Sequence, residues 1–190
     1  MDRNDFERLL EPCLEVAYRY AYKLTGNQDD AVDLVQDATV QAYKSRETFE
    51  MGTNFKAWFM KVLTNKFYKS KMRQNRNPSS VSLDEAEDFF LFQELANSNT
   101  QDTVSEVFNK LDQEEIQKAI NVLPEEFRVV CLLYFLNDFS YEEIASVVEI
   151  PIGTVRSRLH RGRKLLQQQL WQIAKERGIL EHDSVTGGYL

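Results

Sequence analysis

The stretch FSYEEIASVVEIPIGTVRSRLHRGRKLL, residues 139–166, places two helical patterns on either side of a proline. Ser140 is followed three residues later by Glu143, which forms a capping box and predicts that a helix starts there. Pro151 ends that helix, because proline lacks an amide hydrogen and disfavours a helical residue before it. A second helix then opens at Gly153. Two helices joined by so short a turn predict a helix-turn-helix, whose second helix can enter a DNA major groove.

Five cationic side chains and no acid lie between Ile152 and Leu166, in a chain whose formal net charge is −7. The cations point away from the apolar inner face of the second helix, which consists of Val155, Leu159, Leu166 and Leu170. On DNA they would face phosphates and guanine edges. A solvated basic face on an ordinary helical hairpin is the alternative. The capped helix, the proline turn and the acid-free second helix together favour DNA binding.

Length and composition indicate an all-α protein of one or two small domains. The chain has 190 residues, of which 43% are hydrophobic, with only seven glycines and four prolines. No apolar run is long enough to cross a bilayer and MDRNDFERLL at the N-terminus is too charged for a signal peptide, so we expect no membrane insertion and a cytoplasmic location. Cys13 and Cys131 are expected to be buried free thiols. No CxxC motif or Cys/His cluster indicates a metal site, and no cofactor is expected.

Charge is distributed along the chain in large blocks. Residues 1–50 carry −5, residues 51–83 carry +7, residues 84–149 carry −13, residues 150–175 carry +6, and residues 176–190 carry −2. The two basic islands predict two DNA contacts. The acidic remainder opposes binding to naked DNA by long-range repulsion, so we expect the isolated chain to bind DNA weakly without a larger partner.

The first basic island interleaves aromatic and cationic side chains at helical spacing, in MGTNFKAWFMKVLTNKFYKSKMRQNR, residues 51–76. Such a pattern suits single-stranded nucleic acid, because rings stack on bases while cations follow the backbone. The alternative is that the aromatics form a core and the lysines are merely solvated. For Phe59 and Val62 the core interpretation is favoured, whereas the end of the segment favours nucleic-acid contact.

An acidic helix precedes this island, in GNQDDAVDLVQDATVQAYKS, residues 26–45. Gly26 ends the helix before it, and Asn27 or Asp29 is the expected N-cap. One edge of the helix is rich in carboxylates, which could bind a metal or act as a general acid and base. No histidine is near, so a protein-docking face or a plain solvated face is favoured, and a cationic partner would suit it.

Three motifs resemble, in the same order, regions 2.2, 2.3–2.4 and 4.2 of the extracytoplasmic-function sigma factors, group 4 of the sigma-70 family. They are DDAVDLVQDATVQAY, GTNFKAWFMKVLTN and YEEIASVVEIPIGTVRSRLHRGRKLL. These factors are small bacterial subunits that direct RNA polymerase to promoters. The resemblance implies two small helical domains joined by a flexible linker. The implied divisions are region 2 at 1–76, an acidic linker at 77–111, region 4 at 112–176 and a C-terminal tail at 177–190.

The resemblance also implies residues for each contact. The acidic helix is similar to the surface that grips the coiled coil of the largest polymerase subunit, through Asp33, Gln36 and Asp37. The residues implied at the −10 element are Asn54, Trp58, Asn65, Lys66, Lys69 and Arg73. The residues implied at the −35 element are Thr154, Arg156, Ser157, His160, Arg161 and Lys164. Gly162 replaces a usual alanine and costs about 1 kcal/mol in a helix interior, which leaves the rigidity of the helix beyond Arg161 open.

Further implications concern partners. The resemblance implies binding to core RNA polymerase through the coiled coil and the flap, binding to promoter DNA, and inhibition by an anti-sigma factor within a stress response. The holoenzyme would be nucleoid-associated, and the chain would not be an enzyme. The linker acids would occupy a cationic RNA exit path, although simple tethering remains the alternative. Within the linker, LDEAEDFFLFQEL could form a short helix that packs on either domain or on an anti-sigma partner.

Two other classes of protein also carry helix-turn-helix units. A response-regulator activator would need a receiver domain with alternating strands, and the first hundred residues offer none. A recombinase would need a nucleophile or paired acids with a metal. His160 and His182 are the only histidines, and no Ser/Cys triad is evident. Formation of a stoichiometric complex with core polymerase would distinguish the sigma factor from both.

Overall fold

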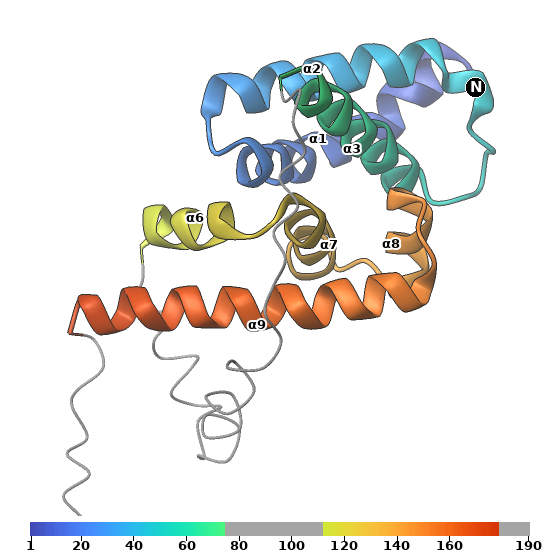
Figure 1. Ribbon diagram of the computed structural model, residues 1–190. Coiled ribbons are helices and arrows are strands. Elements are labelled where there is room, and N and C mark those ends of the chain that lie inside the picture. Colours follow the sequence, from blue (N-terminus) through green and yellow to red (C-terminus); the bar gives the residue numbers. More distant parts are fainter. Residues whose placement is uncertain (75–111, 179–190) are drawn as a thin grey trace, which may run out of the picture.

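The computed structural model describes residues 1–74 and 112–178, and no strand occurs in these two ranges. The all-α prediction is confirmed. The N-terminal bundle consists of α1 (Arg3–Thr25), α2 (Gln28–Lys44), the 3-10 turn η1 (Arg46–Thr48) and α3 (Phe55–Gln74). The C-terminal bundle consists of α6 (Gln113–Val122), α7 (Glu125–Phe135), α8 (Tyr141–Val148) and α9 (Ile152–Glu176). Figure 1 shows the two bundles one above the other, with α9 along the outer side of the second. The predicted linker at 77–111 and nearly all of the tail lie outside the described residues.

The first helix boundary follows from local sequence. Gly26 takes a left-handed conformation with φ of 70° and ends α1, as predicted. Asn27, rather than Asp29, is the N-cap of α2, because its side chain accepts a hydrogen bond from the Asp30 amide at 3.0 Å. These two adjacent residues therefore turn the chain from one helix into the next.

The helix-turn-helix is confirmed, with one shift at its turn. The Ser140 hydroxyl accepts from the Glu143 amide at 3.2 Å, and the Glu143 carboxylate accepts from the Ser140 amide at 2.9 Å, which completes the capping box. The helix ends at Val148, three residues before the proline, because Glu149 adopts a left-handed conformation with φ of 56° and ψ of 44°. Pro151 instead occupies the N-cap position of α9, where its carbonyl accepts from the Thr154 and Val155 amides, and α9 begins one residue earlier than predicted, at Ile152.

The aromatic residues of α3 are buried or half-buried. Phe59 is fully buried, which confirms the core interpretation for this residue, whereas Val62 is only half-buried. The Tyr20 hydroxyl and the Thr64 hydroxyl lie 3.1 Å apart within this core and satisfy one another. The buried face of α3 is formed by Phe55, Phe59, Met60, Leu63 and Phe67. The lysines are therefore left to the other faces of the helix.

Both cysteines are buried free thiols, as predicted. Burial raises the pKa of Cys13, and it raises the pKa of Cys131 to about 12. Both thiols are therefore protonated and unreactive at neutral pH.

Gly162 allows α7 and α9 to approach closely. It is buried, and a Cβ atom at this position would lie 2.5 Å from the Cys131 sulfur and 3.2 Å from the Phe127 Cβ. Helix α9 continues without interruption from Ile152 to Glu176. The glycine therefore does not interrupt α9. Its missing side chain instead leaves room for α7 to pack closely.

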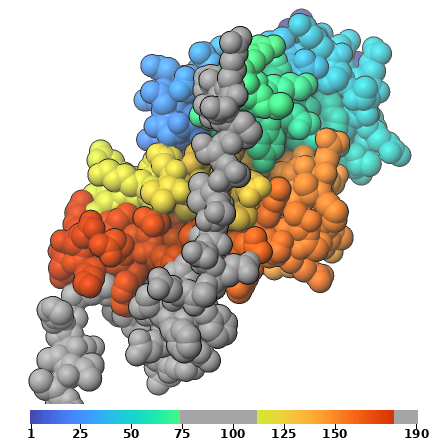
Figure 2. All heavy atoms as spheres, in the orientation of Figure 1, coloured from blue at the N-terminus to red at the C-terminus, as the bar shows by residue number. Residues whose placement is uncertain are grey.

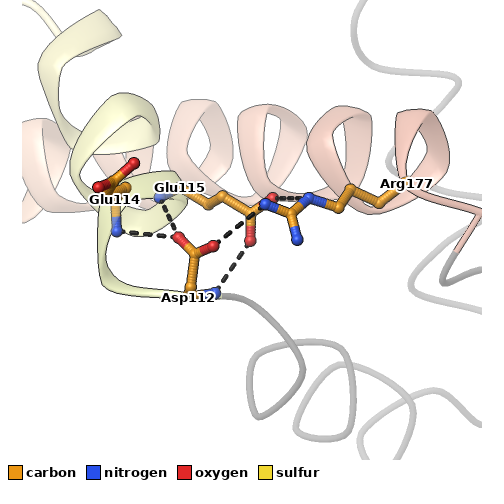
Figure 3. Close-up of polar contacts among 4 residues, drawn as sticks. All are labelled: Asp112, Glu114, Glu115 and Arg177. Carbon is orange, nitrogen blue, oxygen red and sulfur yellow. Dashed lines mark hydrogen bonds and ion pairs between the residues drawn. The ribbon is translucent and has the colours of Figure 1, made fainter.

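The two ends of the C-terminal bundle are joined by a cluster of charged groups (Figure 3). The Asp112 carboxylate accepts from the amides of Glu114 and Glu115, both at 3.0 Å, and caps α6. Arg177, at the end of α9, pairs with Asp112 at 3.1 Å and with Glu115 at 2.5 Å. The hydrogen bond from the Glu115 amide, helped by Arg177, lowers the pKa of Asp112 below its usual value.

The two bundles pack directly on one another, which the sequence did not predict. Their buried apolar side chains form one continuous cluster. Helix α3 packs against α8, and α1 packs against α6 and α7. The spheres of the two bundles meet along this boundary on the face drawn in Figure 2. At one end of the contact, Arg128 and Gln117 donate hydrogen bonds to the main-chain carbonyls of Leu24 and Lys23, both at 3.2 Å.

Candidate nucleic-acid and polymerase interfaces

A groove of about 440 Å³ lies between α2 and α3, and we call it the α2–α3 groove. Four of the six residues expected at the −10 element line it: Asn65, Lys66, Lys69 and Arg73. The remaining lining residues are Asp37, Gln41, Ser45, Val62 and Ser70. Three cations and one acid therefore surround the space. The cations share one side of α3, because they lie three, four or seven residues apart.

The acidic edge of α2 adjoins this groove. Asp33, Gln36 and Asp37 are all exposed, as a docking surface requires. The Asp37 carboxylate lies 3.4 Å from the Lys66 ammonium, and the two side chains are 73% and 30% exposed. An ion pair this exposed contributes only about 0.2–1 kcal/mol, so either partner can exchange it for another contact. The ion pair of Asp37 and Lys66 thus joins the edge expected to bind polymerase to the surface expected to bind the −10 element.

Sequence reasoning missed three polar residues of the groove. Gln41 lies four residues after Asp37 on α2, and Ser70 lies four residues after Lys66 on α3, so helical spacing places each beside a predicted residue. Ser45, the C-cap of α2, carries no comparable signal.

Asn54 and Trp58 lie outside the groove. The Asn54 side chain accepts from the Ala57 amide at 3.1 Å at the start of α3, and donates to the Glu143 carboxylate of α8 at 2.6 Å. Trp58 is half-buried, with ring centroids 5.4 Å from both Phe49 and Phe55. The expected −10 residues therefore divide into a groove set and a set at the opposite end of α3.

The expected −35 residues line the outer side of α9. Arg156, Ser157, His160 and Arg161 are exposed, whereas Thr154 and Lys164 are half-buried. The Ser157 hydroxyl donates to the Thr154 carbonyl at 3.0 Å, and the Arg156 guanidinium lies 5.9 Å from the centre of the Tyr141 ring. Val155 and Leu159 are buried on the inner side, as predicted.

Two of the five cations in this stretch, Arg158 and Arg163, contact residues of α7. Arg158 pairs with Glu126 of α7 at 3.1 Å, and the Arg163 guanidinium lies 5.4 Å from the centre of the Phe135 ring. Both therefore hold α9 against α7, although their charge resembles that of their neighbours. The sequence alone did not distinguish Arg158 and Arg163 from the residues expected to contact DNA.

A second groove, of about 400 Å³, lies on the C-terminal bundle among α6, α7 and α9, and we call it the C-terminal groove. Its apolar lining consists of Ile116, Ile120, Leu123, Cys131, Leu132, Phe135, Leu136 and Leu166. Lys23, Arg128, Arg163 and Gln167 complete the lining. Phe135 is 49% exposed, which leaves a large aromatic surface open at this groove.

Within residues 1–74 and 112–178, no group of three or more His, Cys, Asp or Glu residues is arranged to hold a metal ion. In the same ranges no helix combines the length and apolar character needed to cross a membrane.

Comparison with known proteins accounts for both bundles. The family described as Sigma-70 region 2 matches residues 9–77, and the family described as Sigma-70, region 4 matches residues 113–166. The chain is 31% identical over 176 residues to the ECF RNA polymerase sigma factor SigE of Mycolicibacterium smegmatis, covering 90% of this chain and 63% of SigE. It is 31% identical over 152 residues to the ECF RNA polymerase sigma-E factor of Escherichia coli strain K12, covering 77% and 76% of the two chains.

A solved structure agrees with these matches. The sigma factor RpoE, crystallised with the anti-sigma factor NepR from Bartonella quintana, superposes with a TM-score of 0.68 at 30% identity, covering 88% of this chain and 97% of RpoE. Three observations agree on the family. The two sigma-70 regions match in order, the described residues form helices, and the sequence identity extends over most of the chain. The chain therefore belongs to the extracytoplasmic-function sigma factors of the sigma-70 family.

Proposed function

We propose that this sigma factor binds core RNA polymerase, holds the melted −10 element at the α2–α3 groove, and reads a −35 element with α9. The observation that carries the proposal is the gathering of Asn65, Lys66, Lys69 and Arg73 along one groove. The three cations would follow a phosphate backbone, and the Asn65 amide can both donate to and accept from a base edge. Such contacts would offset the few kcal/mol that extruding a base from its stack costs.

Two other surfaces support contact with proteins. The exposed acidic edge formed by Asp33, Gln36 and Asp37 suits a cationic part of core polymerase, namely the coiled coil of its largest subunit. The C-terminal groove, with half-exposed Phe135, suits the apolar face of an amphipathic helix from the polymerase flap or from an anti-sigma factor. RpoE of Bartonella quintana, which resembles this chain, was solved with an anti-sigma factor.

In this proposal residues 1–76 act as region 2 and residues 112–176 act as region 4, with 77–111 as the connection and 177–190 as a tail. The protein works as a stoichiometric subunit of the polymerase rather than as an enzyme. It acts in the cytoplasm, on the nucleoid when it is part of the holoenzyme. An anti-sigma factor withholds it until a stress signal arrives.

Transcription by reconstituted holoenzyme tests the assignment of α9. A promoter is first selected from a random-sequence library, and each −35 position is then substituted in turn. Arg156→Ala should relax the preference at one or two −35 positions, because an arginine on a guanine edge discriminates by about 1–3 kcal/mol. Lys164→Ala should weaken all promoters about equally, because a phosphate contact carries no sequence preference.

Arg158→Ala is the matched control, since this arginine lies on the same helix but pairs with Glu126. It should leave the rank order of the promoters unchanged. If Arg156→Ala also leaves that order unchanged, α9 does not read bases through this residue. If the wild-type chain with core polymerase selects no promoter, the proposed function itself is wrong.

A further inference from the structure

The C-terminal groove combines an open apolar surface with a cationic lining. Phe135, which is 49% exposed, contributes to the apolar surface. The charged residues of the lining are Lys23, Arg128 and Arg163, and among the described residues no acid lines the groove. An open apolar surface beside cations of one sign is suited to a segment that is both apolar and acidic.

The three cations form no ion pair with a carboxylate within residues 1–74 and 112–178. The Lys23 ammonium donates to the Gln113 side-chain oxygen at 3.4 Å, and the Arg163 guanidinium lies 5.4 Å from the centre of the Phe135 ring. Arg128 donates to three main-chain carbonyls at 2.7–3.2 Å. Burial lowers the pKa of both Lys23 and Arg128. Carboxylates beside these groups would stabilise their charged forms.

One stretch of the chain itself has the complementary composition. LDEAEDFFLFQEL, residues 83–95, contains seven apolar residues and five acids, and it has no lysine or arginine. Four of its apolar residues are consecutive, in FFLF at 89–92. These residues lie outside the part of the chain that the structure describes. The tail at 179–190 matches the groove less well, because it has only two acids and includes a histidine and two glycines.

Chain connectivity keeps this segment near one side of the groove. Residues 96–111 join it to Asp112, the N-cap of α6, and Ile116 of α6 lines the groove. These sixteen residues can span up to about 53 Å, at about 3.3 Å per extended residue. The segment can therefore reach the groove without any change in α6.

The other end of the segment is tethered to α3. Eight residues, 75–82, join it to Gln74 and can span up to about 26 Å. Burial raises the pKa of Glu125 at the start of α7, and the charge of Lys71 opposes that rise, so the last turn of α3 lies near the start of α7. Arg128 of the groove follows one turn later on α7. Both tethers therefore begin close to the groove.

We propose that residues 83–95 occupy the C-terminal groove in the free chain, with their apolar side chains against Phe135 and their acids facing Lys23, Arg128 and Arg163. The inference goes beyond the proposed function, because it concerns the chain before it meets polymerase. A tethered segment acts at an effective concentration of about 1 mM, so an intrinsic dissociation constant of about 0.1 mM would fill the groove in about ten of eleven molecules. A flap helix or an anti-sigma factor that uses this groove must first displace the segment.

Photo-cross-linking in the full chain tests where the segment lies. Phe90→p-benzoylphenylalanine places a photoreactive side chain in the segment, and mass spectrometry of the digested monomer identifies the residues that it joins. Tyr189→p-benzoylphenylalanine is the matched control, because it replaces an aromatic residue of the tail. The Phe90 variant should cross-link to the groove lining on α6, α7 or α9. Cross-links from Phe90 only to other surfaces, or cross-links to the groove from Tyr189 alone, would overturn the proposal.

Binding of a free peptide measures the competition. The probe is a fluorescein-labelled peptide of residues 83–95, whose binding is followed by anisotropy. It is added to the wild-type chain and to a chain in which residues 83–95 are replaced by a Gly-Ser sequence of equal length. The Gly-Ser chain should bind the peptide about tenfold more tightly, because it lacks the tethered competitor. Equal affinities of the two chains would show that the groove is not filled from within.

Two variants of the Gly-Ser chain locate the bound peptide. Phe135→Ala should weaken peptide binding by about tenfold, because it removes apolar area that the peptide would cover. Val122→Ala is the matched control, since Val122 is a 59% exposed apolar residue of the same bundle that does not line the groove, and it should leave the affinity unchanged. Arg163→Gln should also weaken binding, and it keeps the test valid if the loss of Phe135 disturbs the bundle.

The comparison with Val122→Ala decides the outcome. If neither Phe135→Ala nor Arg163→Gln weakens binding more than this control, the groove is not the site of the peptide and the proposal is wrong. The proposed function is tested separately, because none of these measurements contains core polymerase or DNA.

Discussion

Replacing Gly162 by alanine should destabilise the C-terminal bundle, although helix propensity alone predicts the opposite. In an open helix interior the substitution would stabilise by about 1 kcal/mol. Here the new Cβ atom would lie 2.5 Å from the Cys131 sulfur and 3.2 Å from the Phe127 Cβ, so α9 or its neighbours must move. Overpacking a filled core costs about 1–3 kcal/mol, which leaves a net loss of up to about 2 kcal/mol in the free energy of unfolding.

A second variant, Cys131→Ala, should relieve the close contact that Gly162→Ala creates with the Cys131 sulfur. Cys131→Ala alone should cost about 1–2 kcal/mol, because it empties space in the core. With Gly162→Ala present, the new methyl group occupies part of that space, so the double variant should be more stable than the sum of the single effects by about 1–2 kcal/mol.

Urea unfolding of the full chain provides the assay, followed by far-ultraviolet circular dichroism and by Trp171 fluorescence in a Trp58→Phe background. Gly153→Ala is the control, because nothing lies within 4 Å of a Cβ atom at that position of α9. It should stabilise by up to about 1 kcal/mol. If Gly162→Ala stabilises as much as this control, the close approach of α7 and α9 does not constrain residue 162, and the packing argument fails.

Two other predictions concern charged residues. Asp33→Lys combined with Asp37→Lys should weaken co-purification with core polymerase by charge reversal while the bundle stays folded; unchanged co-purification would reject the docking edge. The pKa of Asp112 is depressed in the folded chain, first by the Glu115 amide and then by Arg177, so its carboxylate contributes stability that is present above its unfolded pKa and is lost as pH falls through its folded pKa. Asp112→Asn should therefore show a smaller loss of urea midpoint on acidification, and identical pH dependence would contradict this assignment.

Local features of the fold were predictable from sequence because they depend on residues a few positions apart. The capping box of Ser140 and Glu143 and the glycine end of α1 at Gly26 both follow from residues within one turn, and the cap of α2 was narrowed to Asn27 or Asp29 in the same way. The side chains of Asn65, Lys66, Lys69 and Arg73 could be grouped for the same reason, since one helix presents them.

Features that join distant parts of the chain could not be read in the same way. The contact of Gly162 with Cys131 depends on two helices meeting, and its only sign in the sequence was a glycine that seemed unfavourable. The bond between Asn54 and Glu143 links residues 89 positions apart, and no periodicity records such a pairing. The sequence likewise did not predict that residues of α2 and of α3 line one groove, because this depends on how the two helices pack. The contact roles assigned to these residues remain predictions.

The capping of α1 by the C-terminal bundle has a consequence for how the bundles part. The last carbonyls of a helix have no partner within it, and those of Lys23 and Leu24 are met by Gln117 and Arg128. When the bundles separate, water can replace each partner at little enthalpic loss, because the two carbonyls, the Gln117 amide and the Arg128 guanidinium all become hydrated once exposed. The contact between the two bundles can therefore open at this end while each of these hydrogen-bonding groups gains a water partner. For a partner that prefers the separated form, the main cost at this end is therefore the exposure of apolar contacts to water.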